Sequence, residues 1–552
     1  MEFNLADLWE AVADAHPDRE ALVCGERRLT YADVEARANR LAHELAEHGI
    51  GPGDHVALYL YNGTEYLEAM LAAFKLRAVP VNVNYRYVEE ELAYLLDDSD
   101  AKAVVFHREF APKLAAIRDA LPRLTHFLVV DDECGLDTRT AVGALGALEY
   151  EAALEIASPE RDFAPRSPDD LYVLYTGGTT GKPKGVLWRA EDIFFAALGG
   201  GGISGEPITR PEDITGNLDA DRRCLPACPF MHGTAHWFAF NTLYGGGTVV
   251  ISPEHRFDPV HLWELVARER VTFLVIVGDA FARPLVEAIT TMEPRPDVAR
   301  LSAVLSGGAI LSPAVKAAWV ESLPETILID GFGSSETGGQ GAMVSAAGSS
   351  DSGPPAFRLD TDTTVLDDQL RPAPVGVVGW LARRGRLPVG YYKDPEKTAS
   401  TFPVVDGVRW SVPGDHARLE PDGTITVLGR GSVSINTGGE KVYPEEVESA
   451  LKSHDDVFDA VVVGVPDDHW GERVVAVVAP RAGAEVRLDA LVDHVRSHLA
   501  AYKLPRGLVL VDSVVRSPSG KPDYRWARAV ATDADLASAG PEANTPTASG
   551  PR

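Results

Sequence analysis

Short apolar runs alternate with amphipathic patterns along the first 330 residues of the chain. Val56–Leu60, Ala103–Phe106 and His126–Val130 are each about as long as a typical strand and almost wholly apolar. Between them, apolar residues recur every three or four positions, as they do on one face of a helix. Because buried strands that alternate with helices form parallel sheets with helices on their faces, the pattern predicts an α/β fold.

Local signals mark where the first two helices begin. Asn4 stands before an apolar stripe and can cap a helix, and Thr30 with Asp33 resembles a capping box. Gly49 is a typical stop for the second helix. The stripes themselves are Leu5, Leu8 and Val12, then Val34, Ala38, Leu41 and Leu45.

Length and charge narrow the class of protein. A chain of 552 residues is too long for one hydrophobic core, so we expect two or more domains. The formal charge of −29 argues against nucleic acid or an anionic membrane as a partner. No apolar run reaches the length of a membrane span, and Met1-Glu2-Phe3-Asn4 has no signal-peptide pattern. We therefore expect a soluble cytoplasmic protein.

Four potential metal ligands stand at intervals of four residues. Cys224, Cys228, His232 and His236 would lie along one face of a helix. Prolines within this stretch argue against a continuous helix, and the spacing matches no common zinc arrangement. We therefore expect no structural metal here, and no disulfides in a cytoplasmic protein.

A glycine-rich loop follows the apolar run Leu171–Tyr175, which we expect to be a buried strand. Glycines let consecutive backbone N–H groups turn toward one point, and hydroxyl and ammonium groups add donors, so the loop predicts a polyphosphate site. It is not a Walker A loop, because only three residues separate Gly177 from Gly181 and a proline follows Lys182. The expected phosphate contacts are Thr176, Gly177, Gly178, Thr179, Thr180, Gly181, Lys182 and Lys184.

Two more predicted strands, Ala303–Leu305 and Thr326–Ile329, also lead into glycine-rich loops. The first loop is Ser306-Gly307-Gly308-Ala309 and the second is Asp330-Gly331-Phe332-Gly333-Ser334-Ser335-Glu336. Glycine permits close approach of a flat ring to the backbone. The second loop misses the dinucleotide fingerprint because Glu336 stands where the third glycine belongs. A further predicted strand, Val271–Val277, leads into Gly278-Asp279. Since open parallel sheets bind ligands at one edge, we expect the loops after these three strands to meet there.

These loops, together with Lys521 near the chain end, resemble the motifs of the adenylate-forming superfamily. That superfamily contains acyl-CoA synthetases, firefly luciferase and peptide-synthetase adenylation domains. The resemblance runs from about residue 20 to about residue 528. It implies ATP, Mg²⁺ and coenzyme A as ligands and a small-molecule carboxylic acid as substrate. It also implies a large N-terminal domain of parallel sheets flanked by helices, with a β-barrel-like part, and a small mobile α+β C-terminal domain.

The resemblance assigns roles to particular residues. Glu336 would help to hold Mg²⁺, which needs oxygen ligands, and Ser335 would bond the α-phosphate in place of the usual threonine. Phe332 replaces the usual tyrosine and keeps its stacking face. His232 would lie between the acyl pocket and the nucleotide, with an ordinary loop histidine as the alternative. The remaining implied nucleotide contacts are Gly307, Gly308, Ala309, Asp330, Gly331, Asp415 and Arg430.

The domain boundary is expected just after Arg430. Residues 1–430 would form the adenylation domain, 431–531 the mobile domain and 532–552 a disordered tail, with Gly431-Ser432 as the hinge. Family members mostly carry Asp or Lys at the position of Ser432. Gly438, Gly439 and Lys441 would complete the pantetheine channel for thioester formation. Lys521 is implied to be the catalytic lysine of adenylation.

The acyl substrate is less constrained by the sequence. Cys224–Phe240 contains no acidic residue to pair an amino group, which argues against an amino acid. The chain looks most like actinobacterial steroid side-chain CoA ligases, and small residues after Glu336 would leave room for a ring system. A medium- or long-chain fatty acid, luciferase-type chemistry and a nucleotide-binding protein without catalysis stay as alternatives. A homodimer is also left open. The small residues in question are Gly338, Gly339, Gly341 and Ala342.

Overall fold

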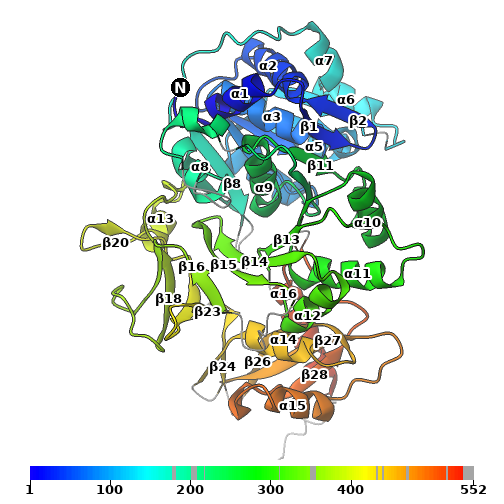
Figure 1. Ribbon diagram of the computed structural model, residues 1–552, viewed down its shortest axis with the longest axis vertical. Helices are drawn as coiled ribbons and strands as arrows, with labels where there is room; N and C mark the ends of the chain where they lie inside the picture. The colour runs from blue at the N-terminus through cyan, green and yellow to red at the C-terminus, as the bar shows by residue number, and fades with distance from the viewer. Residues whose placement is uncertain are drawn as a thin grey trace, which may run out of the picture.

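The computed structural model describes residues 1–132, 134–176, 182–200, 208–216, 218–309, 311–347, 356–430, 433–437, 440–467, 471–517 and 520–538. Figure 1 shows the helices and strands of the first 300 residues stacked above the C-terminal part, with antiparallel strands to one side. The α/β class expected from the alternating pattern is confirmed.

A five-stranded parallel sheet has the order β4-β3-β5-β6-β7. Alternate residues of its central strand face two different cores, because successive side chains of a strand point to opposite faces. Ala103 and Val105 face the largest core, whereas Val104 and Phe106 face a second core. The strands are β3 (His55–Tyr59), β4 (Val79–Asn82), β5 (Ala101–His107), β6 (His126–Val130) and β7 (Leu148–Glu149). The helices are α2 (Tyr31–Glu47), α3 (Thr64–Lys75) and α7 (Tyr150–Ile156) on the first face, and α4 (Glu89–Asp98), α5 (Ala111–Ile117) and α6 (Arg139–Leu145) on the second.

The caps predicted for the first two helices are confirmed. The Ala6 N–H donates to Asn4 Oδ1 over 2.9 Å at the start of α1 (Leu5–Ala15). At the start of α2, the Asp33 N–H donates to Thr30 Oγ1 over 3.1 Å and the Thr30 N–H donates to Asp33 Oδ2 over 2.9 Å. This reciprocal pair satisfies two N–H groups that would otherwise have no partner within the helix.

A second sheet of thirteen strands runs through the middle of the molecule. Its order is β17-β18-β22-β23-β16-β15-β14-β13-β12-β10-β11-β1-β2, parallel from β14 to β1 and antiparallel elsewhere. The N-terminal hairpin closes one edge, with Leu22 opposite Val249. The strands are β1 (Glu20–Cys24), β2 (Arg27–Thr30), β10 (Arg223–Pro226), β11 (Thr248–Ile251), β12 (Phe273–Ile276), β13 (Ala303–Gly307), β14 (Ile327–Ser334), β15 (Gly338–Ser345), β16 (Ala356–Leu359), β17 (Thr363–Leu366), β18 (Val378–Arg383), β22 (Asp415–Leu419) and β23 (Ile425–Arg430).

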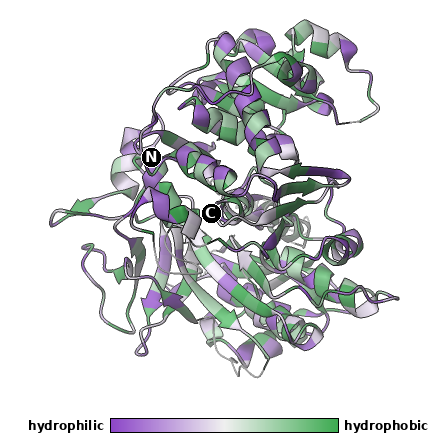
Figure 2. Ribbon diagram, turned by 45° about the horizontal axis from the view of Figure 1, so that its top comes forward, coloured by the Kyte–Doolittle hydropathy of each residue, from purple (hydrophilic) through white to green (hydrophobic). Residues whose placement is uncertain are grey.

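The helices of the middle layer pack on this sheet, on one another or on α1, except α13, which packs on the short strand β19 (Gly390–Tyr391). Figure 2 shows predominantly hydrophobic strands running through these layers. The helices are α8 (Ala190–Ala197), α9 (Gly233–Tyr244), α10 (Pro259–Arg268), α11 (Gly278–Thr291), α12 (Pro313–Ser322) and α13 (Pro395–Thr401). A short hairpin of β20 (Val404–Val405) and β21 (Val408–Arg409) projects beside α13.

The expected strand before the phosphate loop is confirmed, and it belongs to a separate sheet of three strands. β8 (Leu171–Thr176) pairs antiparallel with β9 (Lys184–Arg189), which pairs antiparallel with β19 (Gly390–Tyr391). Thr176 lies opposite Lys184. The chain returns too soon for a parallel crossover, which needs a dozen or more residues. The phosphate loop therefore leaves an antiparallel hairpin, whereas β12, β13 and β14 are parallel neighbours whose carboxyl ends lie at one edge of the sheet, as expected.

The C-terminal part has its own sheet, as expected for a small α+β unit. The order is β25-β24-β27-β26, with β28 parallel to β27, and two separate cores cover the sheet. The strands are β24 (Ile435–Thr437), β25 (Glu440–Val442), β26 (Val457–Asp467), β27 (Gly471–Pro480) and β28 (Gly507–Leu510). The helices are α14 (Pro444–Lys452), α15 (Leu488–Arg496) and α16 (Tyr524–Ser538).

The last helix corrects the expected tail. α16 continues to Ser538, so residues 532–538 are helical rather than disordered. Ala527 and Ala531 are fully buried on this helix against the sheet, and that packing supports the turns beyond them. Residues 539–552 and the predicted hinge at 431–432 lie outside the described residues, so the hinge and the domain boundary stay predictions.

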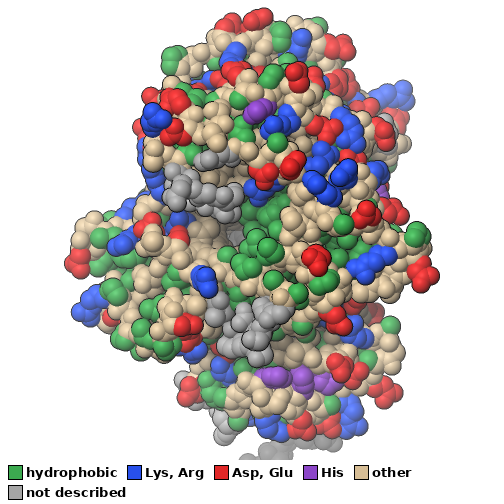
Figure 3. Space-filling view, in the orientation of Figure 1, with side chains coloured by type: hydrophobic (Ala, Val, Ile, Leu, Met, Phe, Trp, Pro, Cys, Tyr) green, Lys and Arg blue, Asp and Glu red, His purple; other side chains and the backbone are tan. Residues whose placement is uncertain are grey.

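Charges are mixed over the surface despite the net charge of −29. Figure 3 shows acidic and basic side chains interspersed over one face. Among the helices that the structure describes, none combines the length and the apolar character needed to cross a membrane.

Candidate active site

Glycines of β13 and β14 lie side by side near the carboxyl ends of these parallel strands in the thirteen-stranded sheet. Gly307 at the end of β13 is opposite Gly331 of β14. Gly308 has φ +89°, and a Cβ placed on it would lie 3.3 Å from Thr234 Oγ1. The left-handed backbone and this close neighbour both favour glycine. The structure thus brings together the glycines predicted to form a flat slot, with Ala309 next in the chain.

Phe332 and Asp330 extend from the same strand into packed surroundings. The Phe332 ring packs edge-on against Phe357, with ring centroids 4.8 Å apart. Asp330 forms a 2.6 Å ion pair with Lys316 of α12, and both side chains are buried. Burial raises the pKa of Asp330 to about 6, although the Lys316 ammonium works in the opposite direction. This ion pair fixes α12 to β14 beneath the glycine slot.

Glu336 is buried and held by groups from other elements. The Tyr391 hydroxyl donates to Glu336 Oε1 over 2.8 Å, and the Ser411 hydroxyl donates to the Glu336 carbonyl over 2.8 Å. The Trp188 ring N–H donates to the Ser335 carbonyl over 3.0 Å. Mg²⁺ is usually bound by one or two carboxylates together with substrate phosphates, so one fixed carboxylate at this edge fits that ion. The sequence assigned no role to Tyr391, whose partner Glu336 lies 55 positions away in the chain.

The described ends of the phosphate loop are anchored to neighbouring elements. Lys184 forms an ion pair with Asp394, whose carboxylate also caps α13. The Lys182 ammonium lies 4.3 Å from the centroid of the Tyr94 ring. Thr176 ends β8. The predicted contacts Gly177, Gly178, Thr179, Thr180 and Gly181 lie outside the described residues.

His232 lies where β10 gives way to α9 and is the N-cap residue of that helix. Its Nε2 atom is buried and has no hydrogen-bond partner. Burial, together with the smaller effect of the nearby Lys521 charge, lowers the pKa of His232 to about 3. His232 therefore carries a neutral imidazole at physiological pH.

The four-residue set of cysteines and histidines does not form a metal centre. His236 uses both ring nitrogens, Nδ1 with the Phe230 carbonyl at 2.6 Å and Nε2 with the Tyr172 hydroxyl at 2.5 Å. Cys224 and Cys228 are buried, and Cys224 lies on a strand. His236 is thus a satisfied core histidine.

The Lys521 turn reaches the first part of the chain. The Ser517 N–H donates to the Lys521 carbonyl over 2.8 Å, which closes the turn. Gly520 has φ +74°, and a Cβ on it would lie 3.1 Å from the Val277 carbonyl oxygen. The backbone before Lys521 therefore lies directly against the end of β12.

A buried ion pair joins the C-terminal part to α11. Lys452 Nζ lies 3.2 Å from Asp279 Oδ2, and the two side chains are 3% and 5% exposed. The Ser312 N–H donates to Asp279 Oδ1 over 2.8 Å. Burial would raise the pKa of Asp279, but Lys452 and the Ser312 N–H together lower it below its ordinary value. The sequence carried no signal for this contact, because the two residues belong to distant segments.

The remaining predicted residues lie along the antiparallel strands. Asp415 is opposite Arg430 in the β22–β23 ladder, so the two predicted ribose contacts start from neighbouring backbone positions. The side chain of Arg430 lies outside the described residues. Lys441 is exposed on β25 opposite Asn436, and Gly438 and Gly439 between these strands are not among the described residues.

The glycines expected to leave room for a bulky substrate do so at one position. A Cβ on Gly338 would lie 2.6 Å from the Ala196 carbonyl, and one on Gly341 would lie 2.5 Å from Phe332 Cε1. Those two glycines accommodate neighbouring protein atoms, so the expectation was wrong for them. A Cβ on Gly339 would lie 3.9 Å from the Ala196 carbonyl, an ordinary van der Waals contact, so additional atoms fit at this position.

Comparison with known proteins identifies the class. Residues 9–392 match the AMP-binding enzyme family, and residues 446–521 match the AMP-binding enzyme C-terminal domain. The chain therefore belongs to the AMP-binding enzyme family, as the resemblance predicted.

Similar proteins refine this placement. A 3-oxocholest-4-en-26-oate–CoA ligase from Rhodococcus rhodochrous is 48% identical over 539 residues, which cover 96% of each chain. A medium/long-chain-fatty-acid–CoA/3-oxocholest-4-en-26-oate–CoA ligase from Mycobacterium marinum is 47% identical, again over 96% of each chain. The fold matches that of an anthranilate CoA ligase complexed with anthranoyl-AMP, with a TM-score of 0.82 at 24% identity over 97% of this chain and 98% of the other.

Proposed function

We propose that this protein is an ATP-dependent, AMP-forming acyl-CoA ligase. The observation that carries the proposal is the docking of the Lys521 turn against the end of β12. That contact brings a cation from the C-terminal part to the side of the molecule that holds the glycine slot and Glu336. The similarity to named CoA ligases over 96% of the chain supports the same activity.

The reaction proceeds through two displacements. A carboxylate oxygen of the acid attacks the α-phosphorus of ATP, so an acyl–oxygen–phosphorus bond forms and pyrophosphate leaves. The thiolate of coenzyme A then attacks the acyl carbon, so a thioester forms and AMP leaves. The protein contributes placement and charge neutralisation rather than covalent chemistry.

Each predicted residue has a task in this scheme. Thr176 and the loop that follows it would hold the β- and γ-phosphates, and Ser335 the α-phosphate. Glu336, fixed by the Tyr391 hydroxyl, would hold Mg²⁺, which neutralises phosphate charge when bound. Lys521 would lie between the substrate carboxylate and the phosphate oxygens as negative charge accumulates. Gly307, Gly308 and Ala309 would flank the adenine, and Asp415 with Arg430 would bind the ribose.

The C-terminal part would adopt a second orientation for thioester formation. In the present orientation the Lys521 turn contacts the end of β12, whereas Lys441 lies on the separate β24–β25 hairpin. A rotation about 431–432 would exchange the two, as in other hinge motions between half-reactions.

A steroid with a carboxylated side chain is the proposed substrate. The names of the similar proteins support this choice, and room for additional atoms at Gly339 is compatible with a ring system. A medium- or long-chain fatty acid is the second candidate, because the Mycobacterium marinum protein is named for both acids. We place the enzyme in the cytoplasm, which is compatible with four unbridged cysteines.

Separate assays of the two half-reactions test the activity. Lys521→Ala should lower pyrophosphate release from acid and ATP by about 10²–10³-fold, the usual effect of losing one electrostatic contact in a transition state. The same variant should convert supplied acyl-adenylate and coenzyme A at a near-normal rate. A comparable loss in both assays would contradict the role of Lys521. A protein without pyrophosphate release on any acid would instead be a nucleotide-binding protein without catalysis.

A panel of acids tests the substrate class. Wild-type enzyme should prefer steroid side-chain acids to palmitate when both are compared by kcat/KM. Faster turnover of palmitate than of every steroid acid would replace the first candidate with the second.

A further inference from the structure

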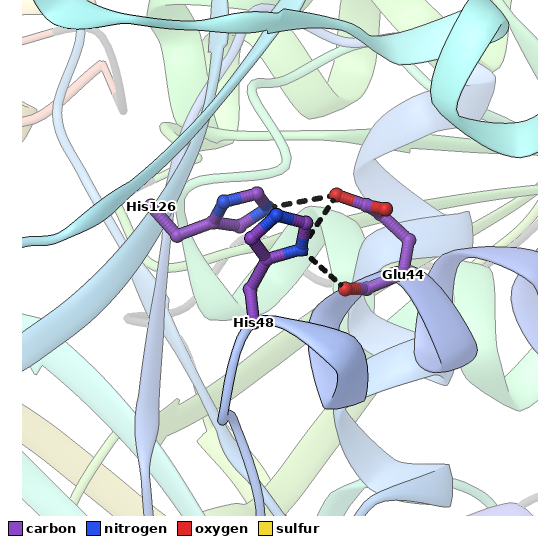
Figure 4. A group of neighbouring side chains, drawn as sticks. All are labelled: Glu44, His48 and His126. Atoms are coloured by element: carbon purple, nitrogen blue, oxygen red, sulfur yellow. Dashed lines mark hydrogen bonds and ion pairs between the residues drawn. The ribbon is translucent and has the colours of Figure 1, made fainter.

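A carboxylate and two imidazoles meet at the end of α2, far from the glycine slot. Glu44 lies in the last turn of α2, His48 is its C-cap residue, and His126 begins β6. Their ligand atoms all lie within 4.8 Å of one another. Figure 4 shows both rings turned toward the Glu44 carboxylate.

The spacing of these atoms suits a small transition-metal ion. Glu44 Oε1 lies 3.1 Å from His48 Nδ1 and 3.1 Å from His126 Nε2. Ligand atoms bound at about 2.0–2.1 Å around a tetrahedral zinc ion are roughly 3.3 Å apart. Each histidine nitrogen thus already lies at nearly the distance from the carboxylate oxygen that tetrahedral coordination requires.

Two of the three ligand atoms are buried without a hydrogen bond. Glu44 Oε1 and His126 Nε2 lie 3.1 Å apart without the alignment of a hydrogen bond, neither forms a hydrogen bond with any other described group, and their side chains are 3% and 6% exposed. A buried polar atom left without a partner is costly, whereas coordination of a cation satisfies both atoms at once. Glu44 and His126 are not among the residues of the adenylation site, so the reaction does not explain why their polar atoms are buried in this way.

We propose that Glu44, His48 and His126 bind a divalent transition-metal ion, with zinc as the favoured occupant. Two imidazoles and one carboxylate are a ligand set that zinc accepts, and a water molecule would complete the tetrahedron. The ion joins the end of α2 to the start of β6 and so ties the helix to the sheet on which it packs. Its effect is on stability rather than on chemistry.

His48 is the exposed member of the cluster, so an ion can enter beside it, and its ring is the one that can rotate to bind the ion. Its side chain is 40% exposed, and its ring stacks on that of His126 with centroids 4.0 Å apart and planes 17° apart. A metal ion lies in the plane of each imidazole that binds it, so one ring must turn. His48 Nδ1 also contacts the Glu44 carbonyl at 2.9 Å. Rotation of this exposed ring exchanges that contact for coordination, while Glu44 and His126 stay in place.

Metal titration of the full-length protein tests the proposal. After EDTA treatment and desalting, calorimetry with Zn²⁺ should show one ion per chain that depends on this cluster. Bound Co²⁺ should show the intense visible absorption of tetrahedral coordination. Glu44→Gln and His48→Asn should each weaken this binding by at least about 100-fold, because loss of an outer partner of a metal ligand already costs 10–100-fold. His43→Asn removes another histidine of α2 and should leave binding unchanged.

Thermal unfolding gives a second readout. Excess Zn²⁺ should raise the melting temperature of the wild type and of His43→Asn, but not that of His48→Asn. His48 is exposed, so this variant should fold normally without metal. No zinc binding by the wild type would overturn the proposal. So would zinc binding that is equal in number and affinity in the wild type, Glu44→Gln and His48→Asn.

Discussion

The buried ion pair between Lys452 and Asp279 should control the orientation of the C-terminal part. Lys452→Met keeps the length and apolar stem of the side chain but leaves the Asp279 carboxylate buried without its cation. Breaking one partner of a buried pair costs about 3–5 kcal/mol. The Ser312 N–H still serves Asp279, so we take the lower end, about 3 kcal/mol, which corresponds to roughly a 100-fold change in equilibrium constant.

The effect should be confined to one half-reaction. The Lys452→Met variant leaves Asp279 without its counterion only in the orientation in which the C-terminal part covers Asp279, which is the one assigned to adenylation. Adenylation should therefore slow by up to about 100-fold. Thioester formation from supplied adenylate should stay near normal. Lys452 also lies near Glu448, but that contact is within the C-terminal part and would persist in both proposed orientations. Its loss therefore affects stability equally in the two states.

A double variant and a control separate these effects. Adding Asp279→Asn to Lys452→Met removes the stranded charge and should restore most of the adenylation rate, because replacing both partners is far less costly than removing one. Lys503→Met breaks an ion pair with Glu446 inside the C-terminal part and should change neither half-reaction. An equal loss in both half-reactions, or no recovery in the double variant, would refute the reasoning.

Three further outcomes are expected. Tyr391→Phe removes the hydroxyl that fixes Glu336, so the Mg²⁺ concentration for half-maximal adenylation should rise several-fold; an unchanged Mg²⁺ dependence would contradict this role. Gly339→Leu fills the room at this position and should lower kcat/KM for a steroid acid more than for a linear acid; equal losses would remove Gly339 from the pocket. Stability should fall as the pH drops below 6.5, because certain histidines stay neutral when folded and gain protons only when unfolded. Between pH 6.5 and 5.5, protonation of each such histidine in the unfolded chain should lower the free energy of unfolding by about 1 kcal/mol, as measured by urea titration. A profile that does not change with pH would contradict their low pKa values. These histidines, with folded pKa values of about 4, 3 and 4, are His107, His232 and His236.

Local signals in the sequence were sufficient for elements whose partners are close in the chain. The capping box at Thr30 predicted the start of α2, because both of its hydrogen bonds lie within four residues. The apolar runs around Val56 and Val104 predicted strands because few other structures bury such segments. Family membership was predicted from ordered motifs and is confirmed by the family match.

Signals failed where a residue's partner lies far along the chain. The apolar run before Thr176 predicted a strand but not the strand with which it pairs, since the same apolar pattern occurs in parallel and antiparallel sheets. Gly341 read as space for a substrate, but the space is filled by the Phe332 ring across the ladder. Tyr391 and Glu336 are joined by one hydrogen bond over 55 positions, which no local pattern encodes.

The position of the β1–β2 hairpin has a consequence for synthesis on the ribosome. β1 pairs with β11, so Leu22 cannot pair with Val249 until Val249 has been synthesised and has left the ribosome. At about 5–20 residues per second, the roughly 220 intervening residues take some 10 to 45 s. During that interval the apolar strand edge of β1 has no sheet to join. The nascent chain therefore carries an exposed, pairing-competent strand for longer than most folding steps last, and shielding of this segment by a chaperone would matter most before residue 251 leaves the exit tunnel.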